Sequence, residues 1–452
     1  MPDVQPKQIA IIGGGILGIT LAYKLSQAGQ RVTLYERGNQ LGGLASYMLY
    51  DGVRIDRFYH TILSSDMSMQ TLIQESGVAD RLHFTATRQG FYDNGQIYPF
   101  SSPMDFLRFP PLTLFQRFRL GLQIIYAQFE RDATRMDVTP VKDWLVKISG
   151  QGVYTKVWKP LLRAKFDSEA VDVPATYIWA RLRRMMGTRQ GVTSKEMMCY
   201  LENGYYTLIE ALAACCEKNG VTIHLETAIQ EIVIDPNGRA AGIRTAEGVT
   251  PFDAIISTLQ SPLLAQLIPG APQPYVEQLQ RQEYLGVLCP LLIMKRSIIP
   301  YYVLNITDET IPFTAVVETT NLIDPRHVKN HHLVYLPKYL APGSELAQWP
   351  DDQVKSEWLK HLKRMFPNFS EADITDFWVQ RARYVEPLRP INTTDQIPTV
   401  KTPVERLYIA NTAMVYPELN NGESGTRLAV RVADQVLADG KTWESSTTNL
   451  LS

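Results

Sequence analysis

Glycines near the start of the chain have the spacing of a phosphate-binding turn. Gly13, Gly15 and Gly18 follow an apolar run at 9–12 and open a segment of helical periodicity that stops at Gly29. The first glycine permits a tight turn, the second lets a pyrophosphate approach the backbone, and the third lets helix and strand pack closely. The amide groups and the positive dipole end of the helix stabilise such an anion. We therefore expect a dinucleotide to contact the backbone of this turn, at Gly13, Gly15, Ile16, Leu17 and Gly18.

An acidic residue ends the second predicted strand of this βαβ unit. The strand covers residues 31–35, and Glu36 follows it directly. A carboxylate at this position accepts hydrogen bonds from a ribose hydroxyl and repels a 2′-phosphate, whereas the neighbouring Arg37 could favour a 2′-phosphate. The predicted strand, turn, helix, second strand and acidic residue occur in the order that a dinucleotide-binding βαβ unit requires. The alternative is a glycine-rich turn in an unrelated α/β domain.

A second glycine pair distinguishes among dinucleotides. Gly42 and Gly43 are followed by Leu44 and Ala45. The segment resembles the FAD-binding start of the superfamily that contains amine oxidases, protoporphyrinogen oxidase, phytoene desaturases and UDP-galactopyranose mutase. The resemblance implies that the pair lies against the flavin side of the diphosphate. An arginine beside the acid is common there, so FAD is favoured over NADP. Leu44-Ala45 is closer to the desaturase and mutase branches than to amine oxidases, which usually have an arginine here.

The resemblance continues near the end of the chain. A strand-like segment ends at Asn411, and Gly425 and Thr426 open a helical pattern. These residues resemble the C-terminal FAD motif, in which a strand ends beside the ribityl chain and a helix N-terminus faces the flavin. A helix dipole there stabilises negative charge on the reduced flavin. The resemblance also implies that Ile229, in a predicted strand pair, lies in the segment whose backbone contacts adenine.

Two aromatic segments supply candidates for the substrate side. Tyr59 and His60 follow a predicted strand, where the family brings the chain under the flavin ring. Trp158 resembles the tryptophan of a mutase motif at the sugar-nucleotide site, and Pro160 predicts a helix break beside it. We therefore take Tyr59, His60 and Trp158 as candidate catalytic or pocket residues. A loop histidine with structural hydrogen bonds and a core tryptophan are the alternatives.

The region from 103 to 129 is rich in aromatic residues, leucine and arginine. An apolar stripe recurs with helical spacing at Leu114, Phe118, Leu122, Ile125 and Phe129. Such a stripe belongs either to a core face or to a helix at a membrane surface or lipid entrance. A core face is the commoner arrangement and is the one we expect.

The composition is that of an ordinary globular protein. The chain has 452 residues, of which 45% are hydrophobic and 20% charged, with a formal net charge of −1. The near-neutral charge gives no reason to expect nucleic acid as a partner. We expect neither a signal peptide nor a membrane-spanning segment, since no apolar run approaches the required length of about 18 residues. No CxxC spacing occurs among Cys199, Cys215, Cys216 and Cys289. Reduced thiols, no metal and a cytoplasmic protein are therefore expected, with membrane contact at most peripheral.

The resemblance, which covers nearly the whole chain, implies an α/β fold. A Rossmann-like FAD-binding domain of the glutathione-reductase type would carry an inserted substrate domain of strands and helices. We expect the FAD-binding domain at 1–100, 201–260 and 401–452. A helical cap would occupy 101–200, and the substrate-domain sheet with its helices would occupy 261–400.

Three functions are compatible with these motifs. The leading one is an FAD-dependent oxidoreductase that transfers a hydride from a small organic molecule to flavin N5, and the aromatic region near 106–129 suggests a lipophilic substrate. The alternative is a redox-neutral flavoenzyme of the UDP-galactopyranose mutase type. A third is a binding module like the Rab GDP-dissociation inhibitors, which share the fold without using flavin. The intact second glycine pair argues against this third reading, and the sequence leaves the oligomeric state open.

Overall fold

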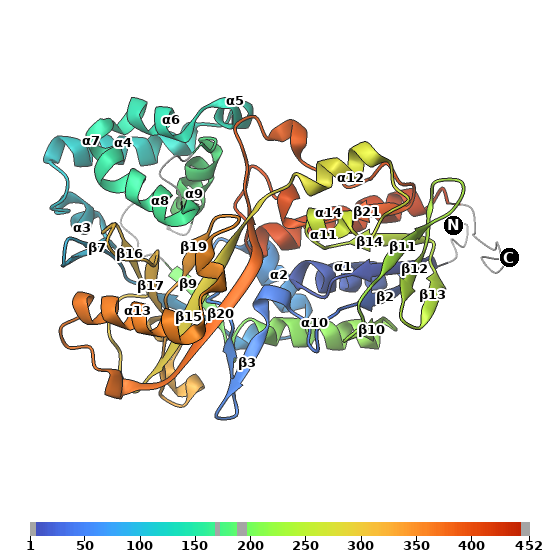
Figure 1. The fold of residues 1–452 in the computed structure, drawn as a ribbon, viewed down its shortest axis with the longest axis horizontal. Helices are drawn as coiled ribbons and strands as arrows, with labels where there is room; N and C mark the ends of the chain where they lie inside the picture. Colours follow the sequence, from blue (N-terminus) through green and yellow to red (C-terminus); the bar gives the residue numbers. More distant parts are fainter. Residues whose placement is uncertain (1–5, 168–171, 188–196, 444–452) are drawn as a thin grey trace.

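The computed structural model describes residues 6–167, 172–187 and 197–443. Figure 1 shows a parallel sheet with flanking helices at one end, and a larger sheet with a helical layer at the other. Two long strands, β15 (Tyr284–Met294) and β20 (Ile374–Pro387), cross the middle of the molecule. Parallel and antiparallel sheets are therefore combined in one α/β fold, as the sequence predicts.

The parallel sheet has five strands in the order β10-β2-β1-β14-β21. Their bounds are Gln8–Ile12 (β1), Arg31–Tyr35 (β2), Thr222–His224 (β10), Ala254–Ser257 (β14) and Leu407–Ile409 (β21). Helix α1 packs against both α10 and α14, with bounds Ile16–Gln27 (α1), Tyr206–Lys218 (α10) and Gly422–Gly440 (α14). Strands β1 and β14 are almost continuously apolar and buried, because helices cover both faces of such a sheet.

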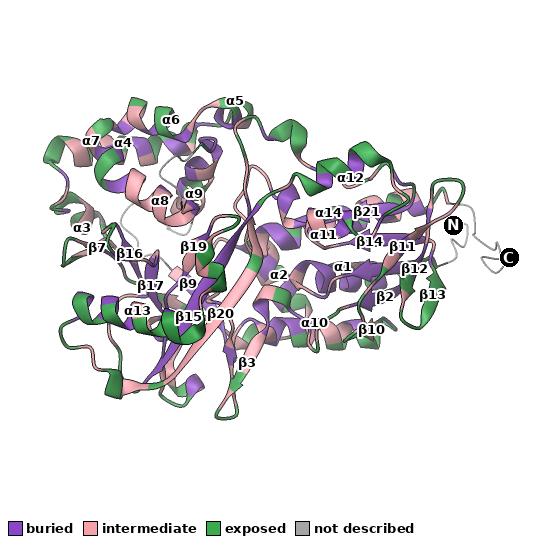
Figure 2. Ribbon diagram, in the orientation of Figure 1, coloured by how far each residue is buried: buried purple, intermediate pink, exposed green. Residues whose placement is uncertain are grey.

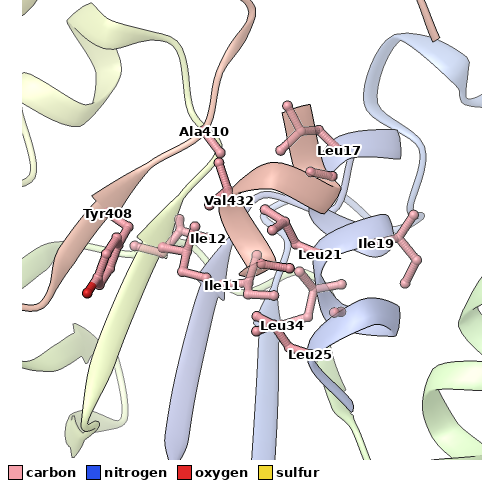
Figure 3. Packing of buried hydrophobic residues seen from close by; sticks show 14 of the residues in the cluster. Ile11, Ile12, Leu17, Ile19, Leu21, Leu25, Leu34, Tyr408, Ala410 and Val432 are labelled. Carbon is pink, nitrogen blue, oxygen red and sulfur yellow. The ribbon is translucent and has the colours of Figure 1, made fainter. Parts of the chain in front are cut away.

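A dense apolar core holds this layer together. Figure 3 shows Ile11 and Leu34 of the sheet against Leu21 and Leu25 of α1, with Val432 of α14 beside them. All of these side chains are buried. This packing fixes the C-terminal end of β1 relative to α1 and α14. A cofactor is expected at the N-termini of these two helices.

A small antiparallel meander and two short helices follow in the chain. The meander consists of β11 (Glu231–Ile234), β12 (Ala240–Thr245) and β13 (Gly248–Pro251). The helices are α11 (Ser261–Ala265) and α12 (Gln273–Gln280), and they pack against each other.

The larger sheet has eight strands and is mainly antiparallel. Its order is β19-β15-β18-β17-β16-β7-β8, and β20 pairs with β15 along almost its whole length. The bounds are Gln89–Asp93 (β7), Gln96–Pro99 (β8), Val303–Ile306 (β16), Ala315–Glu318 (β17), His332–Tyr335 (β18) and Lys338–Leu340 (β19). Every residue of β15 is buried, and α13 (Asp351–Met365) packs against β20.

Short strands connect these parts. They form a hairpin of β3 (Tyr47–Tyr50) and β4 (Val53–Asp56), and a sheet of β5 (Ile62–Leu63), β6 (Leu82–Ala86) and β9 (Met197–Leu201). Helix α2 (Met67–Glu75) contacts α14.

The helical layer comprises α3 to α9. Its bounds are Pro103–Leu107 (α3), Leu114–Phe129 (α4), Ala133–Val138 (α5), Val141–Ser149 (α6), Gln151–Val153 (α7), Lys159–Phe166 (α8) and Thr176–Gly187 (α9). A π-helical turn at Tyr154–Trp158 joins α7 to α8. The predicted helix break at Pro160 is therefore wrong. The proline occupies the first turn of α8, where a backbone N–H is not needed, and the wide π turn before it keeps the chain helical.

The expectation that the apolar stripe of α4 faces the core is also wrong. Leu114, Phe118, Leu122, Ile125 and Phe129 are all exposed. The core-facing side of α4 carries Leu120, Gln123 and Ala127 instead, which pack toward α6 and α9. The apolar side chains do share one face of α4, as their spacing predicts. The contact with the rest of the helical layer is made by the other side of the helix. Among the helices in the described ranges, none is long and apolar enough to span a bilayer.

Candidate functional site

The turn after β1 has the geometry that its glycines predict. Gly13 has a φ of +105° and donates its N–H to the Tyr35 carbonyl at 2.8 Å. A Cβ on Gly18 would overlap the carbonyl oxygen of Gly13. Glycine is therefore required at both positions, at Gly13 by the backbone conformation and at Gly18 by the close approach of helix and turn.

Gly15 is different, because it faces open space. A Cβ added there would meet no atom within 4 Å, and its φ of −69° suits any residue. Gly15 is the N-cap of α1, and no side chain caps the first turn, which begins with Ile16 and Leu17. The N–H groups of an uncapped first turn, together with the helix dipole, form an anion site.

The second glycine pair lies against the first turn. Gly42 donates its N–H to the Gly14 carbonyl at 2.8 Å and forms a parallel bridge with Gly15. Gly42 and Gly43 both have positive φ values, +110° and +57°. A short 3₁₀ turn, Gly43–Ala45, carries Leu44 and the buried Ala45 away from the bridge. We call the combined surface of Gly13 to Gly15 with Gly42 and Gly43 the glycine cradle.

The Glu36 carboxylate closes one side of the glycine cradle. It accepts N–H groups of Gly14 and Gly38, at 2.7 Å and 2.8 Å. Arg37 is exposed beside it. The Thr227 N–H donates to the Glu36 carbonyl at 2.9 Å, which brings the half-buried Ile229 to the same edge.

The start of α14 lies on the other side. Asn421 caps the helix by accepting the Ser424 N–H at 3.1 Å, and a Cβ on Gly425 would meet nothing within 4 Å. The Thr426 hydroxyl donates to the Met69 sulfur at 3.0 Å and is buried. A ligand at this helix end would therefore contact the backbone of Gly425 and Thr426, not the threonine side chain.

The side chain of Asn411 is hydrogen-bonded within the protein and is not available to bind a cofactor directly. Its buried amide donates to the Leu259 carbonyl at 3.0 Å and to Ser261 Oγ at 3.2 Å. Its side-chain oxygen accepts the Ala413 N–H at 3.0 Å. The side chain is thus committed to the turn after β21, and its backbone is what remains for a cofactor.

These backbone surfaces fit a flavin dinucleotide. Open space adjoins Gly15, the N-cap of α1, and Gly425, in the first turn of α14, and these two helices pack against each other. A diphosphate suits the first and an electron-rich ring suits the second. An acidic residue stands at the nucleoside end, where a ribose hydroxyl needs an acceptor.

His60 and Tyr205 line the start of α14. Their ring centroids are 5.1 Å apart, and a Cβ on Gly422 would overlap the Tyr205 hydroxyl. Burial lowers the pKa of His60 to about 4, which the backbone of Phe58 offsets in part. The imidazole is therefore neutral at pH 7, and no hydrogen-bond partner for its buried Nδ1 exists among the described residues.

Asp56 stands next to this pair and was not selected from the sequence. Its carboxylate accepts the Tyr205 N–H at 3.1 Å, and its carbonyl accepts the Tyr335 hydroxyl at 2.6 Å. Burial raises the pKa of Asp56 to about 7, and the Tyr205 hydrogen bond lowers it only in part. An acid that titrates near neutrality thus lies beside the predicted flavin end.

A second group of side chains meets at the junction of helical layer and large sheet. Lys165 of α8 lies 3.1 Å from Glu386 of β20, and its Nζ lies 3.5 Å from the ring centre of Tyr339. Burial alone would lower the pKa of Lys165, but Glu386 and Tyr339 outweigh it and raise that pKa. Tyr59 is hydrogen-bonded to Tyr339, and burial raises its pKa well above the usual value. We call Tyr59, Lys165, Tyr177, Tyr339 and Glu386 the junction cluster; Tyr177 interacts with both charged members.

One hydrogen bond joins the junction cluster to the cofactor end. The Asn420 amide, just before α14, donates to the Val385 carbonyl at 2.8 Å. Val385 precedes Glu386 on β20. The segment just before α14 therefore lies beside the end of β20 that carries Glu386 of the junction cluster.

A cleft leads toward this neighbourhood. Its volume is about 660 Å³, and Phe166, Val173, Leu388 and Arg389 are among its lining residues. Phe166, Val173 and Arg389 also line a narrower adjoining pocket, whose wall includes Tyr177 and Glu386 of the junction cluster. The two spaces together connect the surface with the junction cluster.

Trp158 lies elsewhere. It is buried in the helical layer, and its indole N–H donates to the Gln123 side chain at 3.0 Å. Tyr59, by contrast, packs with the large sheet near Tyr335. The structure thus places His60 beside Tyr205 near the start of α14 and Tyr59 in the junction cluster, whereas the indole N–H of Trp158 is used inside the helical layer. A role for Tyr59 and His60 at the flavin stays a prediction. A role for Trp158 in the pocket stays a prediction.

Several site residues could not be selected from the sequence. Lys165 lies in a segment that resembles the family, but nothing local to it indicates its partner. Glu386 and Tyr339 belong to strands without a recognisable motif. Asp56 ends a strand three residues before Tyr59, so its position in that segment is the one usable signal.

The parallel sheet with its glycine cradle and the larger sheet with its helical layer are the arrangement of a flavin-binding protein. The description "Flavin containing amine oxidoreductase" fits residues 18–437, and the chain belongs to that family. It is an FAD-dependent oxidoreductase. A 15-cis-phytoene desaturase of Synechococcus elongatus is 22% identical over 386 residues, covering 80% of each chain.

Solved structures show the same fold. An oxidoreductase from Methanosarcina mazei superposes with a TM-score of 0.75 at 18% identity, covering 94% of this chain and 100% of that one. Reduced UDP-galactopyranose mutase superposes with a TM-score of 0.75 at 16% identity, covering 96% of each chain. At these identities the likeness concerns the fold alone.

Proposed function

We propose that the enzyme oxidises a lipophilic organic substrate whose reacting carbon is held between the junction cluster and the start of α14. The observation that carries this proposal is the Asn420–Val385 hydrogen bond, which ties the flavin end to the strand that bears Glu386. Bound FAD supplies the two-electron acceptor, taking a hydride at N5. The parallel sheet would be an FAD-binding domain of the glutathione-reductase type.

The cofactor is proposed to bind through backbone groups. The glycine cradle and the first turn of α1, with Ile16, Leu17 and the helix spacing set by Gly18, would hold the diphosphate. The Glu36 carboxylate would give up a hydrogen bond from one backbone N–H and accept one from a ribose hydroxyl instead. Arg37 would lie beside it at the surface. Ile229 would lie at the adenine, and Leu44 and Ala45 would shape the flavin side. Asn411, Gly425 and Thr426 would offer their backbone to the flavin.

Lys165 is proposed to act as a fixed cation. Its raised pKa keeps the ammonium protonated at neutral pH, so it is a hydrogen-bond donor and not a base. Glu386 and the face of Tyr339 hold it in one place. A cation in a largely buried site would stabilise the negative charge that a bound flavin gains on reduction more strongly than a cation in water, and it would lose little by reorganisation.

His60 and Tyr59 are proposed to contact the substrate or flavin from the other side. The neutral imidazole of His60 has a buried Nδ1 without a partner among the described residues, which can donate or accept a hydrogen bond according to the tautomer. The hydroxyl of Tyr59 remains neutral because burial raises its pKa. Both groups therefore orient a ligand by hydrogen bonds without introducing charge.

The cleft is lined mainly by polar and charged residues and offers a lipophilic substrate only a minor apolar part. Phe166, Val173, Leu388 and Pro390 contribute apolar surface between its polar lining residues. The similar Synechococcus protein is named a phytoene desaturase, and a polyene hydrocarbon is accordingly the model substrate. The narrower inner pocket, beside Tyr177 and Glu386, would exclude water from the reacting carbon.

The test is anaerobic titration of the yellow protein with a panel of donors, followed by the flavin absorbance. Polyenes and porphyrinogens form one group, amines a second, and sugar nucleotides with pre-reduced enzyme a third. Bleaching by a lipophilic donor supports the proposal. Bleaching by amines alone would overturn the substrate class. Sugar-nucleotide isomerisation without net bleaching would replace the proposal with mutase chemistry.

A further inference from the structure

The outer side of α4 presents an uncovered apolar face to the surroundings. Leu114, Phe118 and Phe129 are 75%, 62% and 76% exposed, and Figure 2 shows exposed positions along this helix at the rim of the helical layer. Phe115, Leu122, Ile125 and Tyr126 are exposed as well. A soluble surface rarely gathers so many large apolar side chains on one element, and such patches mark interaction sites.

These side chains form one continuous stripe. At about 100° per residue, the positions from Leu114 to Phe129 listed above fall within an arc of about 120°. No charged residue lies inside that arc, and Arg117 and Arg119 fall on its two flanks. Helix α4 carries no acidic residue at all. An apolar stripe bordered by arginines is the pattern of a helix that lies in a membrane interface.

The basic residues are held in place by backbone groups. Arg117 donates to the Leu112 carbonyl at 2.9 Å and also to the Leu107 carbonyl. Arg119 donates to the Ile148 carbonyl at 3.0 Å, at the end of α6. The Lys156 ammonium donates to the Pro111 carbonyl at 2.9 Å, in the loop that precedes α4. A fixed basic border therefore surrounds the N-terminal half of the stripe.

Helix α3 extends the face. Its Met104 and Leu107 are 51% and 54% exposed. Both helices are firmly started by capping boxes, Ser102 with Asp105 and Thr113 with Gln116. The Asp105 carboxylate within α3 accepts the N–H groups of Ser101 and Ser102, and Glu130, which follows Phe129, is paired with Arg135. The apolar residues are thus displayed on well-formed helices, and both nearby carboxylates have partners of their own.

We propose that the face formed by α3 and α4, the α3–α4 surface, binds the anionic surface of a lipid bilayer. The apolar stripe enters the boundary between headgroups and acyl chains, and the basic border contacts headgroup phosphates. A second copy of the chain fits this surface less well. In a two-fold dimer the same patch faces itself, so the basic borders would oppose each other.

The test is sedimentation of the purified full-length protein with vesicles. Phosphatidylcholine vesicles are compared with phosphatidylcholine–phosphatidylglycerol vesicles, at low and high salt. Binding to the mixed vesicles is expected, with weaker binding to the neutral ones and at high salt. The double variant Phe118→Ser/Phe129→Ser is expected to bind about tenfold more weakly or worse, because two apolar anchors are lost.

The matched control is Leu49→Ser. Leu49 is an equally exposed apolar residue, 64% accessible, on β3 outside the helical layer. The Leu49→Ser variant is expected to bind vesicles as strongly as the unmodified protein does. Thermal unfolding should show that both variants and the unmodified protein are equally folded. Equal binding by the double variant and the unmodified protein would overturn the proposal, as would failure of the unmodified protein to bind. A lipid-free dimer that the double variant dissociates would assign the surface to a second copy instead.

Discussion

The ammonium of Lys165 and the carboxylate of Glu386 lie 3.1 Å apart, with 12% and 13% of their side chains exposed. Lys165 belongs to the last turn of α8 and Glu386 to the end of β20, so this ion pair joins the helical layer to the large sheet. Removing each of these charges from water costs free energy, and the attraction between the two charges offsets that cost. The pair therefore makes both residues sensitive to replacement.

Replacement of Lys165 by methionine should destabilise the protein by about 3 kcal/mol, because it leaves the Glu386 carboxylate largely buried without its cation. Urea unfolding of the holoprotein measures this change. Adding Glu386→Leu should restore much of the lost stability, since an apolar pair of similar volume carries no desolvation cost. If the double variant is as unstable as Lys165→Met, the ion pair is not the cause.

The same double variant separates stability from catalysis. It should bind FAD normally, yet its flavin should be reduced by substrate about a hundredfold more slowly, because a preorganised charged donor is missing from the site. Stopped-flow reduction under anaerobic conditions measures this rate. Reduction at the unmodified rate would remove Lys165 from the proposed site.

Gly15 and Gly18 provide a matched pair for the cofactor end. Gly15→Ala places its Cβ in open space, so folding should be unaffected while FAD binds at least about tenfold more weakly, because the methyl group occupies the path of the diphosphate. Gly18→Ala places its Cβ against the Gly13 carbonyl and should lower the unfolding temperature as well. Flavin fluorescence titration and thermal unfolding distinguish the two effects. Normal FAD affinity in Gly15→Ala would place the diphosphate elsewhere.

These cases show why one half of the site can be predicted from sequence and the other cannot. The glycine cradle is encoded largely within one segment: strand, turn and helix follow each other, and the second glycine pair comes soon after the second strand. The junction cluster draws Tyr59, Lys165, Tyr339 and Glu386 from distant segments. No spacing in the chain records that these four meet, since their proximity depends on how the helical layer docks on the sheet.

The apolar stripe of α4 shows a second kind of limit. Its period correctly places Leu114, Phe118 and Phe129 on one face. Periodicity reports which side chains share a face, but not what covers that face. The commoner outcome, burial in the core, is the wrong one here, because Gln123 and Ala127 make the contact with the layer.

A buried aspartate connects the helical layer to the C-terminal motif. Asp137, at the end of α5, accepts the Tyr416 hydroxyl, the Thr394 hydroxyl at 2.7 Å and the Thr394 N–H at 3.1 Å. Burial and the hydrogen bond to Asp137 raise the pKa of Tyr416. Tyr416 also shares a hydrogen bond of 3.0 Å with Thr176 of α9.

Asp137→Ala should therefore cost about 3 kcal/mol of stability, because Tyr416 and Thr394 lose their shared buried acceptor at once. Tyr416→Phe should cost about 1.5 kcal/mol, since the hydrogen bonds of its hydroxyl to Asp137 and Thr176 are lost. Urea unfolding of both single variants and the double variant gives their coupling. Fully additive costs would show that the two residues do not act through one hydrogen bond.

The stability of the protein depends on pH because the pKa of Asp56 differs between the native and unfolded states. Burial raises its pKa from the usual value of 3.8 to about 7. Between these values the native state holds a proton that the unfolded chain has released. The free energy of unfolding therefore falls as pH rises through this window, by up to about 4 kcal/mol at full effect. His60 acts oppositely, because its lowered pKa favours the native state above pH 6.5.

Asp56→Asn should remove the first effect and leave the second. Asparagine still accepts the Tyr205 N–H, so the fold should be retained, but it has no proton to lose. The difference in unfolding free energy between variant and unmodified protein should grow in favour of the variant from about pH 4 to pH 7 and then level off. The contribution of His60 cancels, since both proteins contain it. Urea unfolding at several pH values measures the difference, and a constant difference across this range would mean that Asp56 is already ionised in the native state at low pH.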